Sequence, residues 1–127
     1  MNLHRFLLGL VCLALLCSLG CRDKNAAVSS DPPEAGTTYS LNDGEGGFRA
    51  AKVLAIEDEI IFVNLFSERW LERPSSEAIK KVSAPVSLAY SMQSFTDMRP
   101  ARLQPGTVSS DELDAFEEWK QSKRDVF

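Results

Sequence analysis

Residues 48–66 constrain the fold most, because two apolar runs there flank the polar triplet Glu57-Asp58-Glu59. The second run, residues 60–66, is rich in β-branched and aromatic side chains, which fit a pleated, half-buried surface. It contains neither Gly nor Pro, so no residue interrupts a strand. The pattern predicts a β-hairpin whose turn lies at the acidic triplet.

The region after the hairpin predicts two shorter strands. Residues 85–92 alternate apolar with small or polar side chains, a period of two that indicates a half-buried third strand. Residues 95–100 are expected to be loop, and residues 101–103 to be a short fourth strand that ends before Pro105-Gly106. Residues 75–81 suit either one helical turn or a polar loop.

The clearest helix comes last in the sequence. Ser109 and Glu112 have the spacing of a capping box, in which each end residue accepts a hydrogen bond from the backbone of the other. Leu113, Phe116 and Trp119 follow at spacings of three and are expected to dock on the sheet. The predicted fold is a small, mainly antiparallel β domain, SH3-like or a half-open barrel, closed by this C-terminal helix.

Three stretches, residues 51–54, 63–74 and 109–119, together resemble a loose group of small bacterial domains of unknown role. In that group a strand leads through an acidic turn into a second strand, and a late helix follows. Its strands are similar to those of SH3-like or Tudor-like barrels. Phe66 and Trp70 stand where the group more usually has Tyr and Phe. The resemblance therefore implies a fold and no activity.

The N-terminus has the pattern of a secretory signal peptide. Arg5 precedes the apolar residues 6–19, a run shorter than the roughly 20 residues of a membrane-spanning helix. Ser18-Leu19-Gly20-Cys21 then resembles the lipobox of bacterial lipoproteins, although the usual order places Leu before the small residue. The resemblance implies removal of residues 1–20 and acylation of Cys21, for example with palmitate. Cleavage of the same bond by ordinary signal peptidase and an uncleaved anchor are the alternatives.

The residue after the cysteine bears on location. In lipoproteins of Gram-negative cells, Asp directly after the acylated Cys favours retention in the inner membrane. Here Arg22 follows Cys21, and Asp23 comes one position later. By this resemblance, the protein is expected on the periplasmic face of the outer membrane.

The composition of residues 22–42 predicts a tether. Apart from alanine, the apolar or aromatic side chains of this segment are Val28, Tyr39 and Leu41. Such a segment buries too little surface to offset the entropy of ordering it. Residues 43–47 then hold three of the chain's seven glycines and break any helix or strand. We expect a disordered, lipid-anchored tether over residues 21–46 and a folded domain over residues 47–127.

Charge and residue counts exclude several functions. The 18 Asp and Glu outnumber the 14 Lys and Arg, which disfavours nucleic acid as a partner. Loss of the leader would remove the single histidine, His4, together with Cys12 and Cys17. Ser-His and Cys-His catalysis and Cys/His zinc sites would then be excluded. No cofactor, metal, catalytic residue or small-molecule substrate is predicted.

The predicted partner-binding residues are Trp70, Arg69 and Arg73. They lie in residues 67–74, where four charged side chains surround one indole, and Trp and Arg are enriched where binding energy concentrates. Packing of Trp70 against the sheet is the alternative. Phe48, Phe62, Phe66, Trp70 and Tyr90 would form an aromatic surface if they converged, and otherwise belong to the core.

These features predict a non-enzymatic envelope lipoprotein that binds or scaffolds an envelope protein. The alternative is an inhibitor or immunity lipoprotein that neutralises a lytic enzyme or toxin, and the acidic charge would suit a basic target of this kind. In either case the predicted contact with the membrane is the lipid on Cys21.

Overall fold

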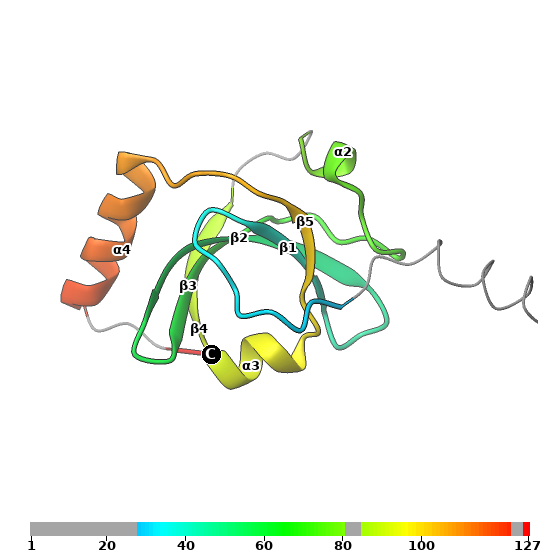
Figure 1. The fold of residues 1–127 in the computed structure, drawn as a ribbon, viewed down its shortest axis with the longest axis horizontal. Helices are drawn as coiled ribbons and strands as arrows, with labels where there is room; N and C mark the ends of the chain where they lie inside the picture. Colours follow the sequence, from blue (N-terminus) through cyan, green and yellow to red (C-terminus); the bar gives the residue numbers. More distant parts are fainter. Residues whose placement is uncertain (1–27, 81–84, 123–125) are drawn as a thin grey trace, which may run out of the picture.

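A computed structural model describes residues 28–80, 85–122 and 126–127. The predicted signal peptide and Cys21 lie outside these residues. In the described chain, five strands form one antiparallel sheet in the order β4-β3-β2-β1-β5. The sheet is open, and helices lie on different sides of it (Figure 1). The predicted class, a small, mainly β domain with a C-terminal helix, is confirmed.

The hairpin consists of β2 (Phe48–Glu57) and β3 (Ile60–Leu65), as predicted. Glu57 pairs with Ile60, so only Asp58 and Glu59 form the turn. Their φ angles, 50° and 63°, are both positive, as a type I′ turn requires. This turn type matches the right-handed twist of the strands, and the hairpin adopts it without the usual Asn-Gly pair.

The tether prediction is wrong for residues 38–42, which form strand β1 (Thr38–Asn42) between β2 and β5. Tyr39 and Leu41 are each only 1% exposed. The segment has little apolar content, but its two large side chains are two residues apart and therefore face the same side of the sheet. Strands on both sides pair with the backbone of β1, so the folded domain begins well before residue 47.

The predicted third and fourth strands are confirmed as β4 (Val86–Ser91) and β5 (Ala101–Gln104). β4 pairs with β3, and β5 returns to pair with β1. Between the hairpin and β4, the short helix α2 (Ser76–Ile79) begins at Ser75, whose side chain accepts a hydrogen bond from the Ala78 N–H. A helical turn therefore occupies the segment for which a loop was the alternative.

One side of the sheet, called the α3 face below, is covered by helix α3 (Met92–Asp97). The prediction of a loop over residues 95–100 is wrong for residues 95–97, which belong to α3, and correct for residues 98–100. The helix is capped by Ser91, whose hydroxyl accepts a hydrogen bond from the Ser94 N–H. Phe95 is fully buried and meets Tyr39 edge-on at 5.7 Å between ring centroids. The sheet contributes the other buried residues of this cluster: Tyr39, Leu41, Ala51, Val53, Ile61 and Val63.

The opposite side, the α4 face, is covered by helix α4 (Ser110–Ser122). The capping box is confirmed: the Ser109 N–H donates to Glu112 Oε1 at 2.9 Å, and the Glu112 N–H donates to Ser109 Oγ at 3.2 Å. Phe116 and Trp119 pack on Phe62, with ring centroids 5.3 and 5.6 Å away. The core assignment of Phe62 is therefore confirmed.

The predicted docking of Leu113 is wrong, because this side chain is 45% exposed. A residue three positions along a helix is displaced by about 60° around the axis, so Leu113 and Trp119 diverge by about 120°. The residues that face the sheet follow the spacing 112, 115, 116 and 119, and Glu112 reaches Lys52 at 2.9 Å. None of the helices in the described residues has the length and apolarity needed to cross a membrane.

Candidate functional site

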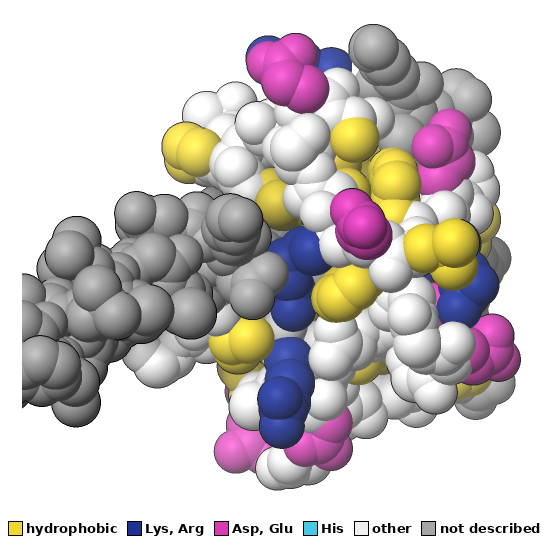
Figure 2. Space-filling model, turned by 90° about the vertical axis from the view of Figure 1, so that its right-hand side faces the viewer, with side chains coloured by type: hydrophobic (Ala, Val, Ile, Leu, Met, Phe, Trp, Pro, Cys, Tyr) yellow, Lys and Arg dark blue, Asp and Glu magenta, His cyan; other side chains and the backbone are white. Residues whose placement is uncertain are grey.

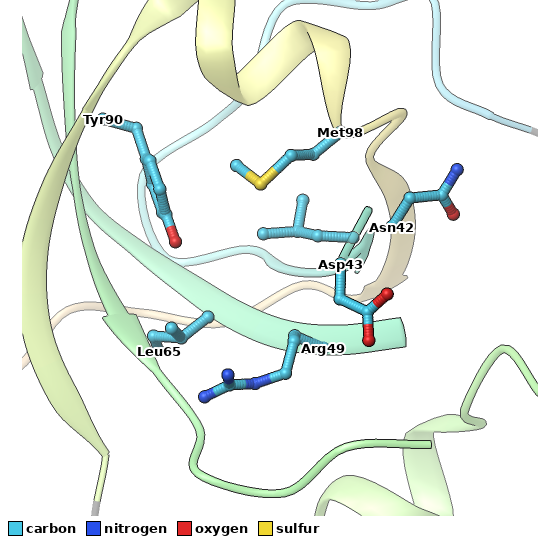
Figure 3. A pocket seen from close by; sticks show the side chains of 7 residues that line it. Asn42, Asp43, Arg49, Leu65, Tyr90 and Met98 are labelled. Atoms are coloured by element: carbon cyan, nitrogen blue, oxygen red, sulfur yellow. The ribbon is translucent and has the colours of Figure 1, made fainter. Parts of the chain in front are cut away.

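A pocket of about 130 Å³ opens at the edge of the α3 face, and we call it the mouth (Figure 3). Its lining side chains come from β1, β2, β3, β4 and the loops after β1 and α3: Leu41, Asn42, Asp43, Arg49, Leu65, Tyr90 and Met98. The apolar members continue the buried cluster of this face. The polar members stand around them, so the mouth has an apolar floor and a polar rim.

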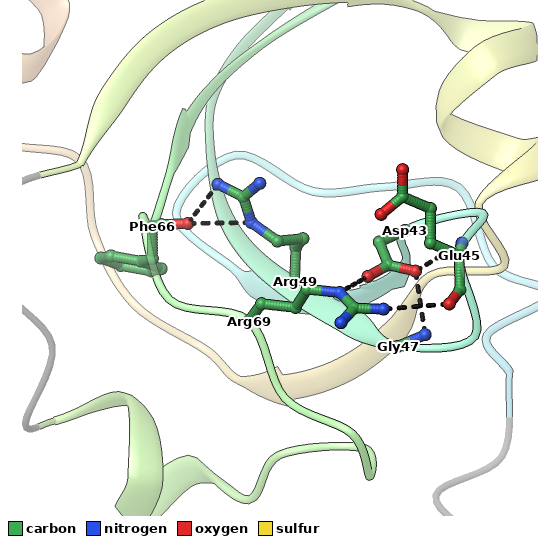
Figure 4. A network of polar contacts seen from close by, with 6 residues as sticks. All are labelled: Asp43, Glu45, Gly47, Arg49, Phe66 and Arg69. Carbon is green, nitrogen blue, oxygen red and sulfur yellow. Dashed lines mark hydrogen bonds and ion pairs between the residues drawn. The ribbon is translucent and has the colours of Figure 1, made fainter.

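Arg49, on β2, is the cation of the mouth. Its Nε and Nη2 donate to the Phe66 carbonyl at 3.3 and 2.9 Å, which fixes the backbone just after β3 (Figure 4). That carbonyl is a neutral acceptor. Among the described residues, no carboxylate lies within ion-pair distance of Arg49, and Nη1 has no hydrogen-bond partner. The positive charge is therefore available to a ligand.

Asp43, in the β1–β2 loop, is fully engaged. Its Oδ1 accepts from the backbone N–H groups of Glu45 and Gly47 at 2.8 and 2.9 Å, and its Oδ2 accepts from Arg69 Nε (Figure 4). The hydrogen bond from Arg69 is the largest effect on the pKa of Asp43. Desolvation opposes it, the two backbone hydrogen bonds add to it, and the pKa falls to about 2.

The same loop depends on a glycine. A Cβ on Gly47 would lie 2.8 Å from Arg69 Nη2, Asp43 Oδ2 and the Trp70 carbonyl oxygen, which is too close for any of them. The loop is thus packed against the segment that follows β3. The Asp43 carboxylate accepts the hydrogen bonds that hold this loop in place, so the loop gives one side of the mouth a fixed shape.

Tyr90, on β4, supplies the second polar group that faces the floor. Figure 3 shows its hydroxyl pointing toward the space above Leu65 and Arg49. Burial raises the pKa of Tyr90, and the charge of Arg49 opposes this only in part. The phenol therefore stays protonated near neutral pH and can donate. No partner for this hydroxyl lies within the described part of the chain.

The predicted partner-binding residues lie beside the mouth and contact the domain itself. Trp70 is half-buried, and its backbone exchanges two hydrogen bonds with Phe48, at 2.7 and 2.9 Å. Arg69 pairs with Asp43 and donates to the Glu45 carbonyl at 3.0 Å. Asp43 raises the pKa of Arg69 by hydrogen bonding to it. The structure therefore brings Arg69 and Trp70 to the β1–β2 loop.

Arg73 turns inward from the same segment. Its Nη1 donates to Ser40 Oγ at 2.6 Å, and its guanidinium lies 4.7 Å from the centroid of the Phe48 ring. Desolvation lowers the pKa of Arg73. Arg69, Trp70 and Arg73 thus fasten this segment to β1, β2 and the loop between them. Leu71 lies in the same segment and is 79% exposed. Contacts of Trp70, Arg69 and Arg73 with a partner stay a prediction.

The aromatic surface considered from the sequence does not form, because Phe62 lies on the α4 face and Tyr90 on the α3 face. In the acidic turn, Glu57 reaches Lys120 at 3.2 Å. Across residues 28–80, 85–122 and 126–127, no three His, Cys, Asp or Glu side chains are grouped as a metal site would require.

Sequence reasoning missed Asp43, Arg49 and Tyr90 as members of one site. Asp43 accepts hydrogen bonds from the backbone N–H groups two and four positions later. An Asp in a glycine-rich segment is a local sequence signal for a turn of this kind. An apolar floor with a few convergent polar groups is the usual composition of a binding pocket. Comparison with protein-family models, curated proteins and solved structures finds no match to this chain.

Proposed function

We propose that this protein is a non-enzymatic binding module of the bacterial cell envelope, held on the membrane by a lipid on Cys21. The mouth is the observation that carries the proposal. It joins an apolar floor to an arginine whose charge has no acidic partner among the described residues. The fastened segment over residues 67–74 lies next to it and presents the exposed Leu71.

The chemistry of the mouth supports binding over catalysis. A general base needs a pKa near the working pH and a free lone pair directed at its substrate. The carboxylate that lines the mouth, Asp43, has a pKa of about 2 and already accepts hydrogen bonds from three donors. Of the other polar side chains in the lining, Arg49 and Tyr90 act as donors near neutral pH, and Asn42 carries a neutral amide, which is not a base.

The anchor is proposed from the sequence, in which Gly20-Cys21 follows an apolar run, and the outer membrane is proposed from Arg22. The structure adds a limit on reach. The Ser29 N–H already bonds the Pro100 carbonyl at 2.9 Å, so only a few residues separate Cys21 from the domain. At about 3.5 Å per residue, they span at most about 30 Å. The partner would then lie close to the membrane surface.

The face shown in Figure 2 does not indicate a polyanionic partner. Lys and Arg side chains lie there among hydrophobic and acidic ones, and no continuous patch of one charge covers the described residues of this face. A mixed surface of this kind gives no reason to expect nucleic acid or another polyanion as the partner.

Site-specific photo-crosslinking in cells tests the proposal. A photoreactive residue is placed at Asn42 in the mouth, at Leu71 beside it, and at the exposed Leu113 on α4 as the control. We expect a defined envelope protein to be captured from the first two positions and not from the third. Introducing Arg49→Gln should abolish capture from position 42, whereas Arg102→Gln, away from the mouth, should preserve it.

Equal capture from all three positions, or capture that Arg49→Gln leaves unchanged, would contradict the mouth as the partner site. A captured lytic enzyme or toxin would favour the inhibitor alternative. A separate experiment tests the lipid anchor: the Cys21→Ser variant should lose palmitate labelling and membrane retention. A variant that still matures and stays on the membrane would show that no lipid on Cys21 is needed.

A further inference from the structure

Two hydrogen-bond donors, Arg49 and Tyr90, line the mouth, and the amide of Asn42, which also lines it, points away from both of them (Figure 3). Nη1 of Arg49 has no hydrogen-bond partner among the described residues, and the charge of Arg49 acts on the Tyr90 hydroxyl. Asp43 cannot neutralise Arg49, because its own charge is paired with Arg69. A cation and a neutral donor in the lining of one pocket favour an anion, and a guanidinium suits a carboxylate particularly well.

The floor limits what carries this anion. Leu41, Leu65 and Met98 provide aliphatic and thioether surface, with no ionisable group among them. The volume of about 130 Å³ is slightly below the ~150 Å³ of an apolar cavity that holds one benzene molecule. Four to six heavy atoms of a branched aliphatic group would fill a space of about this size, whereas a sugar or a nucleotide would extend beyond it.

We infer that the mouth binds a carboxylate carried on a compact aliphatic group, with Arg49 and Tyr90 on the carboxylate and the aliphatic group against Leu65. The C-terminal residue of a peptide that ends in leucine has this chemistry, and so does a free branched short-chain acid. The inference deepens the proposed function and rests on it, because it specifies what part of a partner enters the mouth.

Titration calorimetry of the full mature protein in detergent tests the inference with three ligands: a hexapeptide ending in leucine, the same peptide with a C-terminal amide, and 4-methylvalerate. We expect the acid peptide to bind at least tenfold more tightly than the amide, since the amide lacks the charge that faces Arg49. If the acid peptide binds more tightly than 4-methylvalerate, the natural ligand is the end of a peptide chain. If 4-methylvalerate binds as tightly as the acid peptide, the natural ligand is a free acid.

Four variants distinguish the contribution of the Arg49 charge to binding from that of the apolar floor. Arg49→Gln should weaken binding of the acids at least tenfold and leave the amide unchanged, whereas the matched control Arg102→Gln should bind like the natural chain. Tyr90→Phe keeps the ring and should cost several-fold in affinity. Because Arg49 also holds the Phe66 carbonyl, a melting curve must show that Arg49→Gln is folded. Leu65→Phe fills the pocket without touching either donor and should abolish binding of all three ligands.

Failure of both acids to bind at about 10 mM, or equal affinity for acid and amide, would overturn the inference. Crosslinking from Asn42 that still depends on Arg49 would then leave the proposed function intact, with a different group in the mouth. If no envelope protein is crosslinked from Asn42 but 4-methylvalerate binds tightly, the inference holds and the proposed protein partner is contradicted.

Discussion

At the scale of single residues, charged side chains divide into those that hold the domain together and those that stay available. Arg69 and Arg73 look alike in the sequence as charges around Trp70, yet one fastens a loop and the other covers Phe48. Arg49 stands in an apolar strand and would pass as a solvated edge residue. Only the geometry shows that its charge has no acidic partner among the described residues.

The first prediction concerns the titration of Asp43. Its pKa of about 2 lies below the usual 3.8, so its contribution to stability is complete above about pH 4 and is lost as the pH falls toward 2. Carboxyl-detected NMR should place the midpoint near 2, and Arg69→Gln should raise it toward the usual value. A midpoint near 3.8 in the natural chain would show that the contact with Arg69 does not persist in solution.

At the scale of elements, the two helices cover opposite faces by different means. α3 supplies one fully buried ring, Phe95, whereas α4 supplies Phe116 and the half-buried Trp119. α4 is also fixed at its first turn. Burial raises the pKa of Glu112, but hydrogen bonds from Ser109 and Lys52 outweigh this, and the net effect lowers it. The carboxylate therefore stays charged and continues to link α4 to β2.

The second prediction uses the indole N–H of Trp119, which is buried and has no hydrogen-bond partner among the described residues. Trp119→Ala should cost about 2–3 kcal/mol of unfolding free energy, somewhat less than a fully buried ring. Trp119→Phe keeps a stacked ring and removes an unsatisfied donor, so its cost should stay within about 1 kcal/mol. Urea unfolding measures both. Equal losses for the two variants would show that the N–H does find a partner.

At the scale of the whole molecule, β1 joins the fold to the site. It lies between β2 and β5, buries Tyr39 and Leu41, and leads directly into Asp43 at the mouth. The low apolar content of residues 22–42 predicts that the same five residues, 38–42, belong to a tether. The domain boundary therefore decides both whether the core forms and whether the mouth exists.

The third prediction follows from this placement. A chain that begins at residue 28 keeps all five strands and should unfold cooperatively, whereas one that begins at residue 47 should show no cooperative transition. Loss of two buried side chains alone removes about 3–6 kcal/mol, a large part of the 5–15 kcal/mol of a typical domain. Thermal denaturation followed by circular dichroism compares the two. Matching melting temperatures would mean that β1 is dispensable.

What the sequence predicted was local. The hairpin, β4, β5 and the capping box of α4 each depend on a pattern within one continuous stretch of at most about 20 residues, and all four form. β1 and α3 depend on neighbours far along the chain: β1 needs two flanking strands, and α3 needs a sheet face for Phe95. The mouth combines residues from four strands and two loops, so no window of the sequence contains it.

The central claim is that the mouth binds a carboxylate carried on a compact aliphatic group. The most direct measurement is a series of ¹H–¹⁵N NMR spectra of the chain from residue 28 onward, recorded while the leucine-ended peptide is added. We predict shift changes at Asn42, Arg49, Leu65 and Tyr90, including the Arg49 side-chain N–H, and none on α4. Unchanged spectra, or changes centred on α4 with the mouth unaffected, would contradict the claim.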